Sequence, residues 1–495
     1  MNIFTERSSG VLMHISSLPG KTGIGTMGQQ AYNFVDFLSK AGQTYWQILP
    51  LCPTSYGDSP YQSFSTFAGN PYFIDFELLE KDGYIKASDY ENIVWSGSES
   101  YVDYGTLYNQ RKICFDIICK NFAKKPAKDY EKFCQENAFW LDDFALFMAI
   151  KDAHNGAAFG EWEDDIRVRR APALEKWSKK CGAQAENYKI LQYLFYKQWA
   201  DLKAYANKKG IGIIGDIPIY VAADSADVWT NPGNFMLDKN KVPVEVAGCP
   251  PDAFTEDGQL WGNPIYNWKA MKKDGYSWWK KRLGASLKNY DVIRIDHFRG
   301  FDSYYCIPYG AKNAKKGVWR EGPGIDLFNE LKKEFGEMQI IAEDLGYLTD
   351  SVKKMLKDSG FPGMKVLQFA FGCGVESEYL PFRYEKNSVV YTGTHDNDTI
   401  NGWVETASEK DINFAMEYLR LNKKEEILSN LMITGLASVC NTCVLTMQDL
   451  IGLGSEARIN TPSTVGNNWK WRATEDQIND GTAGWLLKYT KLYGR

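Results

Sequence analysis

Short runs of aliphatic and β-branched residues recur along the chain and alternate with longer stretches in which apolar residues have helical spacing. A buried parallel strand is a near-continuous apolar run, whereas an amphipathic helix repeats its apolar residues every three or four positions. Eight strand-like runs are predicted, at residues 10–14, 45–49, 211–216, 292–296, 339–343, 365–369, 389–392 and 444–448. Eight strands that alternate with helices predict an α/β chain folded as a closed (β/α)₈ TIM barrel, whose active site lies at the carboxyl ends of the strands.

The spacing of these runs is uneven. About 160 residues separate the second and third runs, and about 75 separate the third and fourth. Connections of that length in a compact domain are structured insertions. We therefore predict one catalytic domain over residues 1–495, with a mainly helical insertion at 57–205 and substrate-binding loops over the barrel mouth at 220–290. Helical spacing in the first insertion is clearest at 108–122, 139–152 and 185–209.

Composition and charge limit the classes of partner that the protein is expected to bind. The chain has 495 residues, 44% of them hydrophobic, and a formal net charge of only -5. A small charge on a chain of this size argues against a dedicated nucleic-acid or membrane surface. Residues 1–9 lack the apolar stretch of a secretory signal, and no segment reaches the roughly 20 apolar residues of a membrane span. We expect a cytoplasmic protein.

The ten cysteines are scattered singly, without the spacing of a disulfide framework, so we expect reduced thiols. Cys440 and Cys443 form the one Cys-x-x-Cys pair. No second pair and no nearby histidine complete a zinc site. Packed thiols are therefore favoured over a redox or metal motif.

Three acidic residues, Asp296, Glu343 and Asp396, each follow a short apolar run and precede turn residues. Carboxylates at strand ends are costly to bury unless they are paired or used. Arg294 and Asp296 lie on the same side of their strand, and a guanidinium favours the ionised form of a neighbouring carboxylate. Asp296 is thus either a charged nucleophile or stabiliser, or half of a structural ion pair.

Glu343 has an acidic neighbour, Asp344, and only one of two adjacent strand residues faces the barrel centre. The sequence does not decide which. A glutamate that is partly desolvated near other acids has a raised pKa and can act as a general acid. The alternative role for this position is a helix-capping carboxylate.

Asp396 follows His395, and Asp398 lies close by, so these acids with the histidine could ligate a metal ion. The chain has only four histidines, however, and the first strand lacks the His-x-His pair of barrel metallohydrolases. We therefore expect neither a metal nor another cofactor. His14, His297 and His395 all stand at predicted strand ends, where neutral imidazoles suit hydroxyl recognition.

Loops at 58–62, 250–254 and 258–266 mix aromatic residues with Asp, Gln and Asn. Aromatic faces pack against pyranose rings while amides and carboxylates bind hydroxyls, so Phe254 and Gln259 are candidate sugar contacts. No phosphate loop, nucleophile elbow or dinucleotide fingerprint is present.

Taken together, the motifs resemble those of the 4-alpha-glucanotransferases (amylomaltases, or disproportionating enzymes), a branch of the alpha-amylase superfamily. The resemblance rests on motifs in family order over nearly the whole chain: 10–19, 57–61, 68–71, 215–221, 250–266, the three acid motifs, and 458–472. Ala253 and Ser463 depart from residues frequent in the family, which leaves loop shape and product size open.

The resemblance implies that Asp296 is the nucleophile, Glu343 the acid/base and Asp396 the stabiliser of the distorted donor sugar. It implies further substrate contacts from Tyr61, Asp216, Asp252, Trp261, Arg294, His395 and Asn468, and a secondary glucan site at Tyr56. The implied activity is retaining transfer of alpha-1,4-glucan segments to the 4-hydroxyl of a glucan or glucose acceptor, through a covalent glucosyl intermediate. The implied substrates are maltooligosaccharides, amylose, starch or glycogen.

Two alternatives remain. An alpha-glucan hydrolase would use the same acids, and a non-catalytic glucan-binding protein would keep the sugar-contacting loops. Retention of three mutually repelling acids argues against the second, because a pure binder has no use for them.

Overall fold

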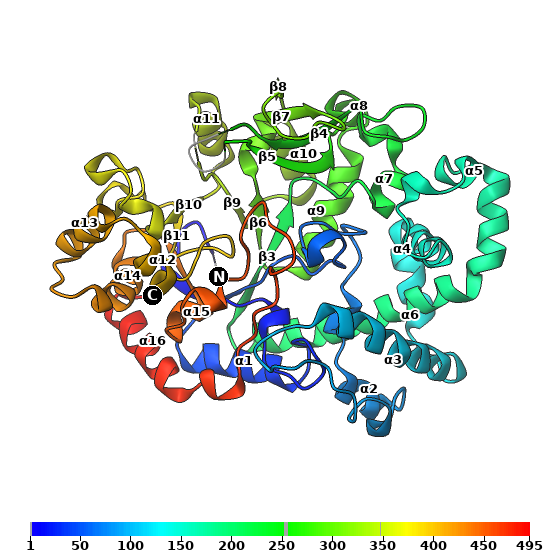
Figure 1. Ribbon diagram of the computed structural model, residues 1–495, viewed down its shortest axis with the longest axis horizontal. Coiled ribbons are helices and arrows are strands. Elements are labelled where there is room, and N and C mark those ends of the chain that lie inside the picture. Colours follow the sequence, from blue (N-terminus) through cyan, green and yellow to red (C-terminus); the bar gives the residue numbers. More distant parts are fainter. Residues whose placement is uncertain (1, 252–255, 347) are drawn as a thin grey trace.

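A closed barrel of eight parallel strands forms the centre of the protein (Figure 1). The computed structural model describes residues 2–251, 256–346 and 348–495. Around the barrel the strands follow the order β1-β12-β11-β10-β9-β6-β3-β2. Their bounds are β1 Ser8–Leu12, β2 Tyr45–Gln47, β3 Gly212–Pro218, β6 Val292–Asp296, β9 Ile340–Ala342, β10 Gly363–Val366, β11 Ser388–Tyr391 and β12 Thr442–Thr446. The predicted TIM barrel is confirmed.

Each predicted run overlaps one barrel strand, but several strands end earlier than predicted. The run at 365–369 continues past β10 because Leu367–Ala370 forms a 3-10 turn. The run at 444–448 continues past β12 because Thr446 caps the short helix α15 (Met447–Leu450), its side chain accepting from the amide of Asp449. Apolar residues continue into these turns, so hydrophobicity alone overestimates strand length.

Alternate residues of each strand pack into two different layers. Val292 of β6 belongs to a cluster that also contains Leu12, Ile214 and Val444 from other barrel strands. Ile293 and Ile295 belong to the larger core between the strands and the helices. Because strand side chains alternate, Arg294 and Asp296 lie on the same inner side of the barrel as Val292.

Helices fill most of the segment between β2 and β3. They lie on one side of the barrel, drawn in blue and cyan in Figure 1. The long pair α4 and α6 packs together, and α3 begins where the Asp103 side chain accepts from the Thr106 amide. The bounds are α2 Phe76–Asp82, α3 Tyr104–Lys124, α4 Tyr130–Ala153, α5 Asp164–Arg167 and α6 Ala171–Lys208.

The segment between β3 and β6 differs from the long loops expected at 220–290. It contains β4 (Glu245–Cys249) and β5 (Gln259–Pro264), which join β7 (Ser303–Pro308) and β8 (Val318–Glu321) in an antiparallel sheet of order β5-β4-β7-β8. The sequence hides these strands because glycines interrupt them. At Gly248 a Cβ would lie 2.1 Å from the carbonyl oxygen of Gln259, so the close strand pairing requires glycine.

The remaining helices precede, connect or follow the barrel strands along the chain. They are α1 Gln29–Lys40, α7 Ala226–Thr230, α8 Trp268–Lys273, α9 Ser277–Asn289, α10 Ile325–Phe335, α11 Asp350–Ser359, α12 Ile400–Thr406, α13 Glu409–Leu419, α14 Ile427–Ala437 and α16 Asp480–Leu492. Among the described residues, no helix is long and apolar enough to cross a membrane.

Candidate functional site

The carboxyl ends of β3 and β6 bring two acids to one guanidinium. Asp216 and Arg294 are register partners on these neighbouring strands. Arg294 donates to Asp216 Oδ2 at 2.6 Å and to Asp296 Oδ1 at 3.2 Å. The side chains of Arg294 and Asp216 are 4% and 0% exposed, whereas that of Asp296 is 27% exposed. Arg294 therefore anchors a buried acid on one side and an accessible acid on the other.

Glu343 lies beside Asp296 at the end of the next strand. Ile295 pairs with Ala342, so Asp296 and Glu343 follow at the same level on strands that lie about 4.8 Å apart. Glu343 Oε2 accepts from the amide of His297 at 2.6 Å. Its neighbour Asp344 is buried and accepts from the amide of Met364 at 2.6 Å. Of the two adjacent acids, Glu343 is the one that joins Asp296.

The turn after β6 supplies the amide that Glu343 accepts. His297 has a φ of 52°, in the left-handed region that residues other than glycine seldom adopt. Trp261 packs edge-on against the His297 ring, with centroids 4.8 Å apart. Such strained turns persist only where surrounding contacts hold them, and they concentrate at functional sites.

Asp396 lies on the opposite side of the site, beyond the end of β11. His395 Nε2 is 3.4 Å from Asp396 Oδ2. Tyr61 stacks on His395 with ring centroids 4.9 Å apart, and its hydroxyl donates to Asp216 Oδ2 at 2.9 Å. Tyr61 thereby connects the β3 side of the barrel to the Asp396 side. Asp216, Asp296, Glu343 and Asp396 are together called the acid cluster below.

Burial raises the pKa of Asp296, Arg294 lowers it, and the charges of Glu343, Asp216 and Asp396 raise it again. The net shift of the Asp296 pKa is upward. The sequence predicts that Arg294 favours the ionised form of Asp296, but the effect of Arg294 is smaller than the effects that raise the pKa. Burial also raises the pKa of Glu343. Two carboxyls this close titrate as a pair. Arg294 bonds to Asp296, and the amides of His297 and Leu345 bond to Glu343, so each carboxyl has a partner that favours its charged form.

The histidines of the site are neutral near pH 7. Burial lowers the pKa of His14 and of His297 to about 3, and it lowers the pKa of His395. His14 Nδ1 accepts from the amide of Leu49 at 3.2 Å, as an unprotonated nitrogen must. With the histidines neutral, the four carboxyl groups of the acid cluster are accompanied by one guanidinium, that of Arg294. This negative excess suits a reaction in which positive charge develops on the substrate.

The other sequence candidates have different surroundings. Trp261 Nε1 donates to Gln259 Oε1 at 3.0 Å, and both residues lie on β5. Asn468 is 7% exposed, and its amide bonds to Thr461 and Thr464 of its own loop. In this structure the Asn468 side chain shapes the loop rather than reaching the acid cluster. Asp252 and Phe254 lie outside the described residues.

Tyr56 is 76% exposed, away from the barrel centre. A cavity of about 390 Å³ lies between the preceding residues and helices α3, α4 and α6. Thr54, Ser55 and Tyr108 line this cavity, whereas Tyr56 does not.

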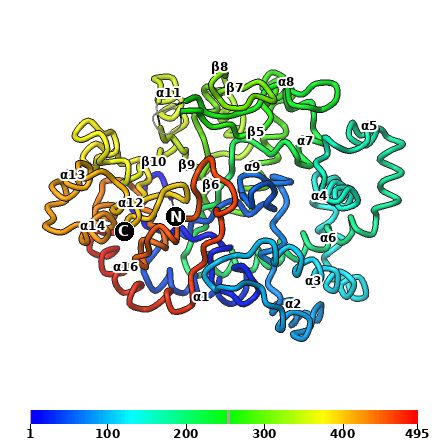
Figure 2. Tube along the Cα trace, in the orientation of Figure 1, coloured from blue at the N-terminus to red at the C-terminus, as the bar shows by residue number. Residues whose placement is uncertain are grey.

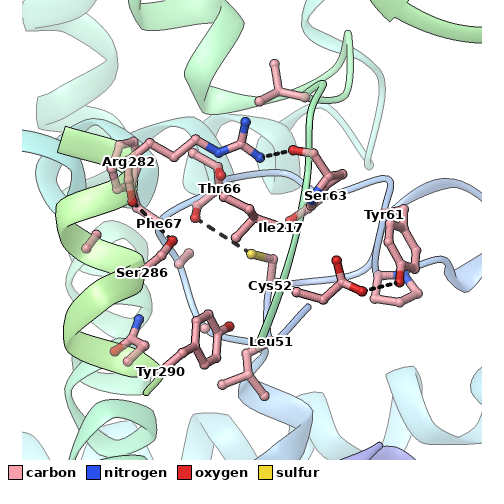
Figure 3. Close-up of a pocket in the computed structure, with 18 of the residues that line it drawn as sticks. Leu51, Cys52, Tyr61, Ser63, Thr66, Phe67, Ile217, Arg282, Ser286 and Tyr290 are labelled. Carbon is pink, nitrogen blue, oxygen red and sulfur yellow. Dashed lines mark hydrogen bonds between the residues drawn. The ribbon is translucent and has the colours of Figure 1, made fainter. Parts of the chain in front are cut away.

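A second, smaller cavity of about 30 Å³ lies behind Tyr61 (Figure 3). Cys52, Tyr290 and Arg282 line it together with Asp216. Asp216 Oδ1 is buried and has no hydrogen-bond partner among the described residues. The cavity is large enough for a water molecule.

One contact to the acid cluster was missed by sequence reasoning. Asn460 Nδ2 donates to Asp396 Oδ1 at 2.6 Å. The two residues are 64 positions apart in the chain, so no local pattern predicted their contact.

Within the described residues, no group of three or more His, Cys, Asp or Glu side chains could hold a metal ion. Asp398, which the sequence made a candidate ligand, instead accepts from the hydroxyl of Ser455 at 2.7 Å. Cys440 and Cys443 are buried free thiols.

Comparison with known proteins shows the family of the chain. A family model described as 4-alpha-glucanotransferase matches residues 13–477. The 4-alpha-glucanotransferase of Clostridium butyricum is 50% identical over 98% of this chain and 100% of its own length. That of Streptococcus pneumoniae is also 50% identical, over 99% and 98%.

Among solved structures, the amylomaltase from Streptococcus agalactiae in complex with acarbose has a TM-score of 0.97 and 44% identity, covering 99% of this chain and 100% of its own. The amylomaltase from Corynebacterium glutamicum, at 18% identity and a TM-score of 0.79, covers 98% of this chain and 75% of its own and shares the fold. The chain therefore belongs to the 4-alpha-glucanotransferase family, whose members are enzymes that transfer segments of alpha-1,4-glucans.

Proposed function

We propose that this enzyme transfers a glucan segment from a maltooligosaccharide donor to the 4-hydroxyl of a second glucan or of glucose, with retention of configuration, through a covalent intermediate on Asp296. The observation that carries the proposal is the pairing of Ile295 with Ala342, which sets Asp296 and Glu343 level on neighbouring strands. Retaining enzymes need two carboxyl groups about 5 to 5.5 Å apart. The spacing of adjacent parallel strands, about 4.8 Å, supplies nearly that distance.

In the first step an oxygen of Asp296 attacks the anomeric carbon, and Glu343 gives its proton to the glycosidic oxygen as that bond breaks. In the second step the acceptor's 4-hydroxyl attacks the same carbon, its proton passes to Glu343, and the Asp296 carboxylate leaves. The first step needs a charged Asp296 and a protonated Glu343, whereas the second needs the Asp296 ester and a charged Glu343 that accepts the acceptor's proton. We propose that before the first step Glu343 holds the proton and Asp296, which bonds to Arg294, holds the charge.

Asp396 and the neutral residues around it would hold the donor sugar. Positive charge develops at the anomeric carbon, and the negative excess of the acid cluster stabilises it. Tyr61, Asp216, His297 and His395 offer hydroxyl, carboxylate and imidazole groups at the same rim. We propose that they bind the donor's hydroxyls.

Transfer also requires that an acceptor sugar outcompete water. We propose that Gln259 and Trp261 on β5 form part of the acceptor wall. Gln62 Nε2 donates to the Trp261 carbonyl at 3.3 Å, which ties this wall to the loop that carries Tyr61. A continuous wall on that side excludes solvent from the intermediate.

Longer substrates such as amylose, starch or glycogen extend beyond these subsites. We propose that Tyr56 contributes to a secondary glucan site, because its exposed ring stands next to the residues that line the 390 Å³ cavity. A cytoplasmic location completes the proposal, in agreement with ten cysteines that are all free thiols.

Incubation with maltotriose tests this function. Transfer conserves the number of reducing ends, so we expect glucose and maltodextrins longer than maltotriose while the total of reducing ends stays constant. The products are measured by chromatography and the reducing ends by a colorimetric assay in the same samples. A steady rise in reducing ends without longer products would show a hydrolase and contradict the proposal.

A further inference from the structure

Residues 458–473, called the strap below, bond to Asp396 at one end and to Ser100 and Tyr101, just before α3, at the other (orange to red in Figure 2). At one end the Asn460 amide donates to the carbonyl of His395 at 3.1 Å. At the other end the amides of Arg472 and Ala473 donate to the carbonyls of Ser100 and Ser17 at 2.8 and 2.9 Å. The strap is therefore fixed on both sides of the site.

Two residues of the strap hold Asp396. Asn460 Nδ2 donates to Asp396 Oδ1 at 2.6 Å. Arg458 donates from one nitrogen to the Asp396 carbonyl and from another to the Asn460 carbonyl, both at 2.8 Å. Arg458 thus joins the backbone of the acid to the backbone of the residue that grips its side chain.

Asp396 needs such support more than the other acids do. Asp296 is the last residue of β6, whereas Asp396 lies five residues beyond the end of β11, and its side chain is 43% exposed. The barrel ladder therefore does not fix its position. A carboxylate that stabilises a transition state must already be in place before the reaction, because reorganising it during the reaction costs free energy.

We propose that Asn460, held by Arg458, is a positioning residue that acts through Asp396: its amide fixes Oδ1, while Oδ2 lies 3.4 Å from His395 Nε2. This inference rests on the proposed role of Asp396. Asn460 itself need not touch the substrate.

Replacing Asn460 with Ala should lower kcat with maltotriose by about 10- to 100-fold, the loss typical of a misplaced catalytic group, and change KM by less than about threefold. The matched control is Thr464→Ala in the same strap, because the Thr464 hydroxyl bonds to Thr461 and Asn468 of its own loop rather than to Asp396. That variant should keep kcat within about twofold. Equal losses in both variants would overturn the proposal.

Asn460→Asp keeps the shape of the side chain and removes the donor, and it tests the proposal if the alanine variant fails to fold. Two carboxyls this close share a proton at low pH. A protonated Asp at 460 would donate to Asp396 as the amide does. The groups facing Asp396 are His395, Arg458, Asp296 and Tyr61, and all of them are the same in both proteins.

We therefore expect the ratio of variant to parent kcat to rise as the pH falls from 8 to 5. A purely structural role for Asn460 gives a constant ratio across that range, which would contradict the proposal.

A double-mutant cycle with Asp396→Asn shows through which residue Asn460 acts. If Asn460 acts through the Asp396 carboxylate, then Asn460→Ala causes no further loss in the Asp396→Asn background. Independent, multiplying losses would overturn the positioning role. Full turnover by Asp396→Asn alone would instead show that the role of Asp396 in the proposed function is wrong, so the two failures are distinguishable.

Discussion

Replacement of Asp296 by Asn is expected to lower kcat with maltotriose by about 10⁴-fold or more, because an amide cannot form the glucosyl ester on which both steps depend. The amide oxygen still accepts from Arg294, so the surrounding hydrogen bonds are kept. The measurement is product formation by chromatography over long incubations, at saturating maltotriose.

The matched control is Asp291→Asn, which removes a carboxylate immediately before the first residue of β6. Asp291 accepts from Asn207 and from the amide of Ile213, away from the acid cluster. That variant should keep kcat within a few-fold. If Asp296→Asn turned over as fast as the Asp291 control, the nucleophile assignment would be wrong.

Asp296→Asn should also change the pH dependence of the free energy of unfolding. Burial raises the pKa of Asp296 in the folded protein, so between the unfolded and folded pKa values the folded state binds more protons than the unfolded state. The parent therefore loses stability as the pH rises through this window, and the asparagine variant does not lose that contribution. Denaturant unfolding should show Asp296→Asn to be at least as stable as the parent at neutral pH, with an advantage that grows from acidic to neutral pH.

The second large effect concerns the guanidinium at the centre of the acid cluster. Arg294→Met should lower the free energy of unfolding by about 3 to 5 kcal/mol, because it leaves a fully buried partner carboxylate without its cation. The Asp216 side chain is 0% exposed, and Arg294 donates to it at 2.6 Å. Methionine fills much of the space, so the loss reports mainly on charge. Urea unfolding followed by circular dichroism measures it.

Two further variants interpret that result. Arg320→Met breaks an exposed ion pair with Glu245, where Arg320 is 49% exposed, and should cost less than about 1 kcal/mol. Asp216→Asn introduced together with Arg294→Met should recover part of the lost stability, because the buried negative charge is gone. A loss for Arg294→Met no larger than that for Arg320→Met would contradict the electrostatic description of the site.

The sequence predicted the barrel well because parallel strands buried on both faces leave an unmistakable apolar pattern. It failed for β4 and β5, where Gly248 and Gly262 interrupt that pattern: close strand pairing requires glycine at Gly248, and Gly262 has a left-handed φ of 78° within β5. It also placed 365–369 too far along the chain, because a 3-10 turn remains as apolar as the strand before it. Local hydrophobicity does not distinguish a strand from the buried turn that follows it.

In the site, the predicted strand ends gave the positions of Asp296 and of the pair Glu343 and Asp344. They did not show which acid of that pair faces Asp296. That choice depends on the end of β9 at Ala342 and on the left-handed turn at His297, which directs its amide at Glu343. The direction of the pKa shift of Asp296 depends on its burial in the folded barrel, which the sequence of a single strand does not reveal. The contact between Asn460 and Asp396 joins residues 64 positions apart.

The central claim is that Asp296 becomes covalently attached to the donor sugar. Glu343→Gln mixed with α-maltosyl fluoride tests it most directly, because fluoride leaves without a proton from residue 343 whereas the second step still lacks its base. Peptide mass spectrometry of the quenched protein should find one maltosyl group on the peptide that contains Asp296. A maltosyl group on any other residue, or fluoride release with no modified peptide at all, would contradict the account.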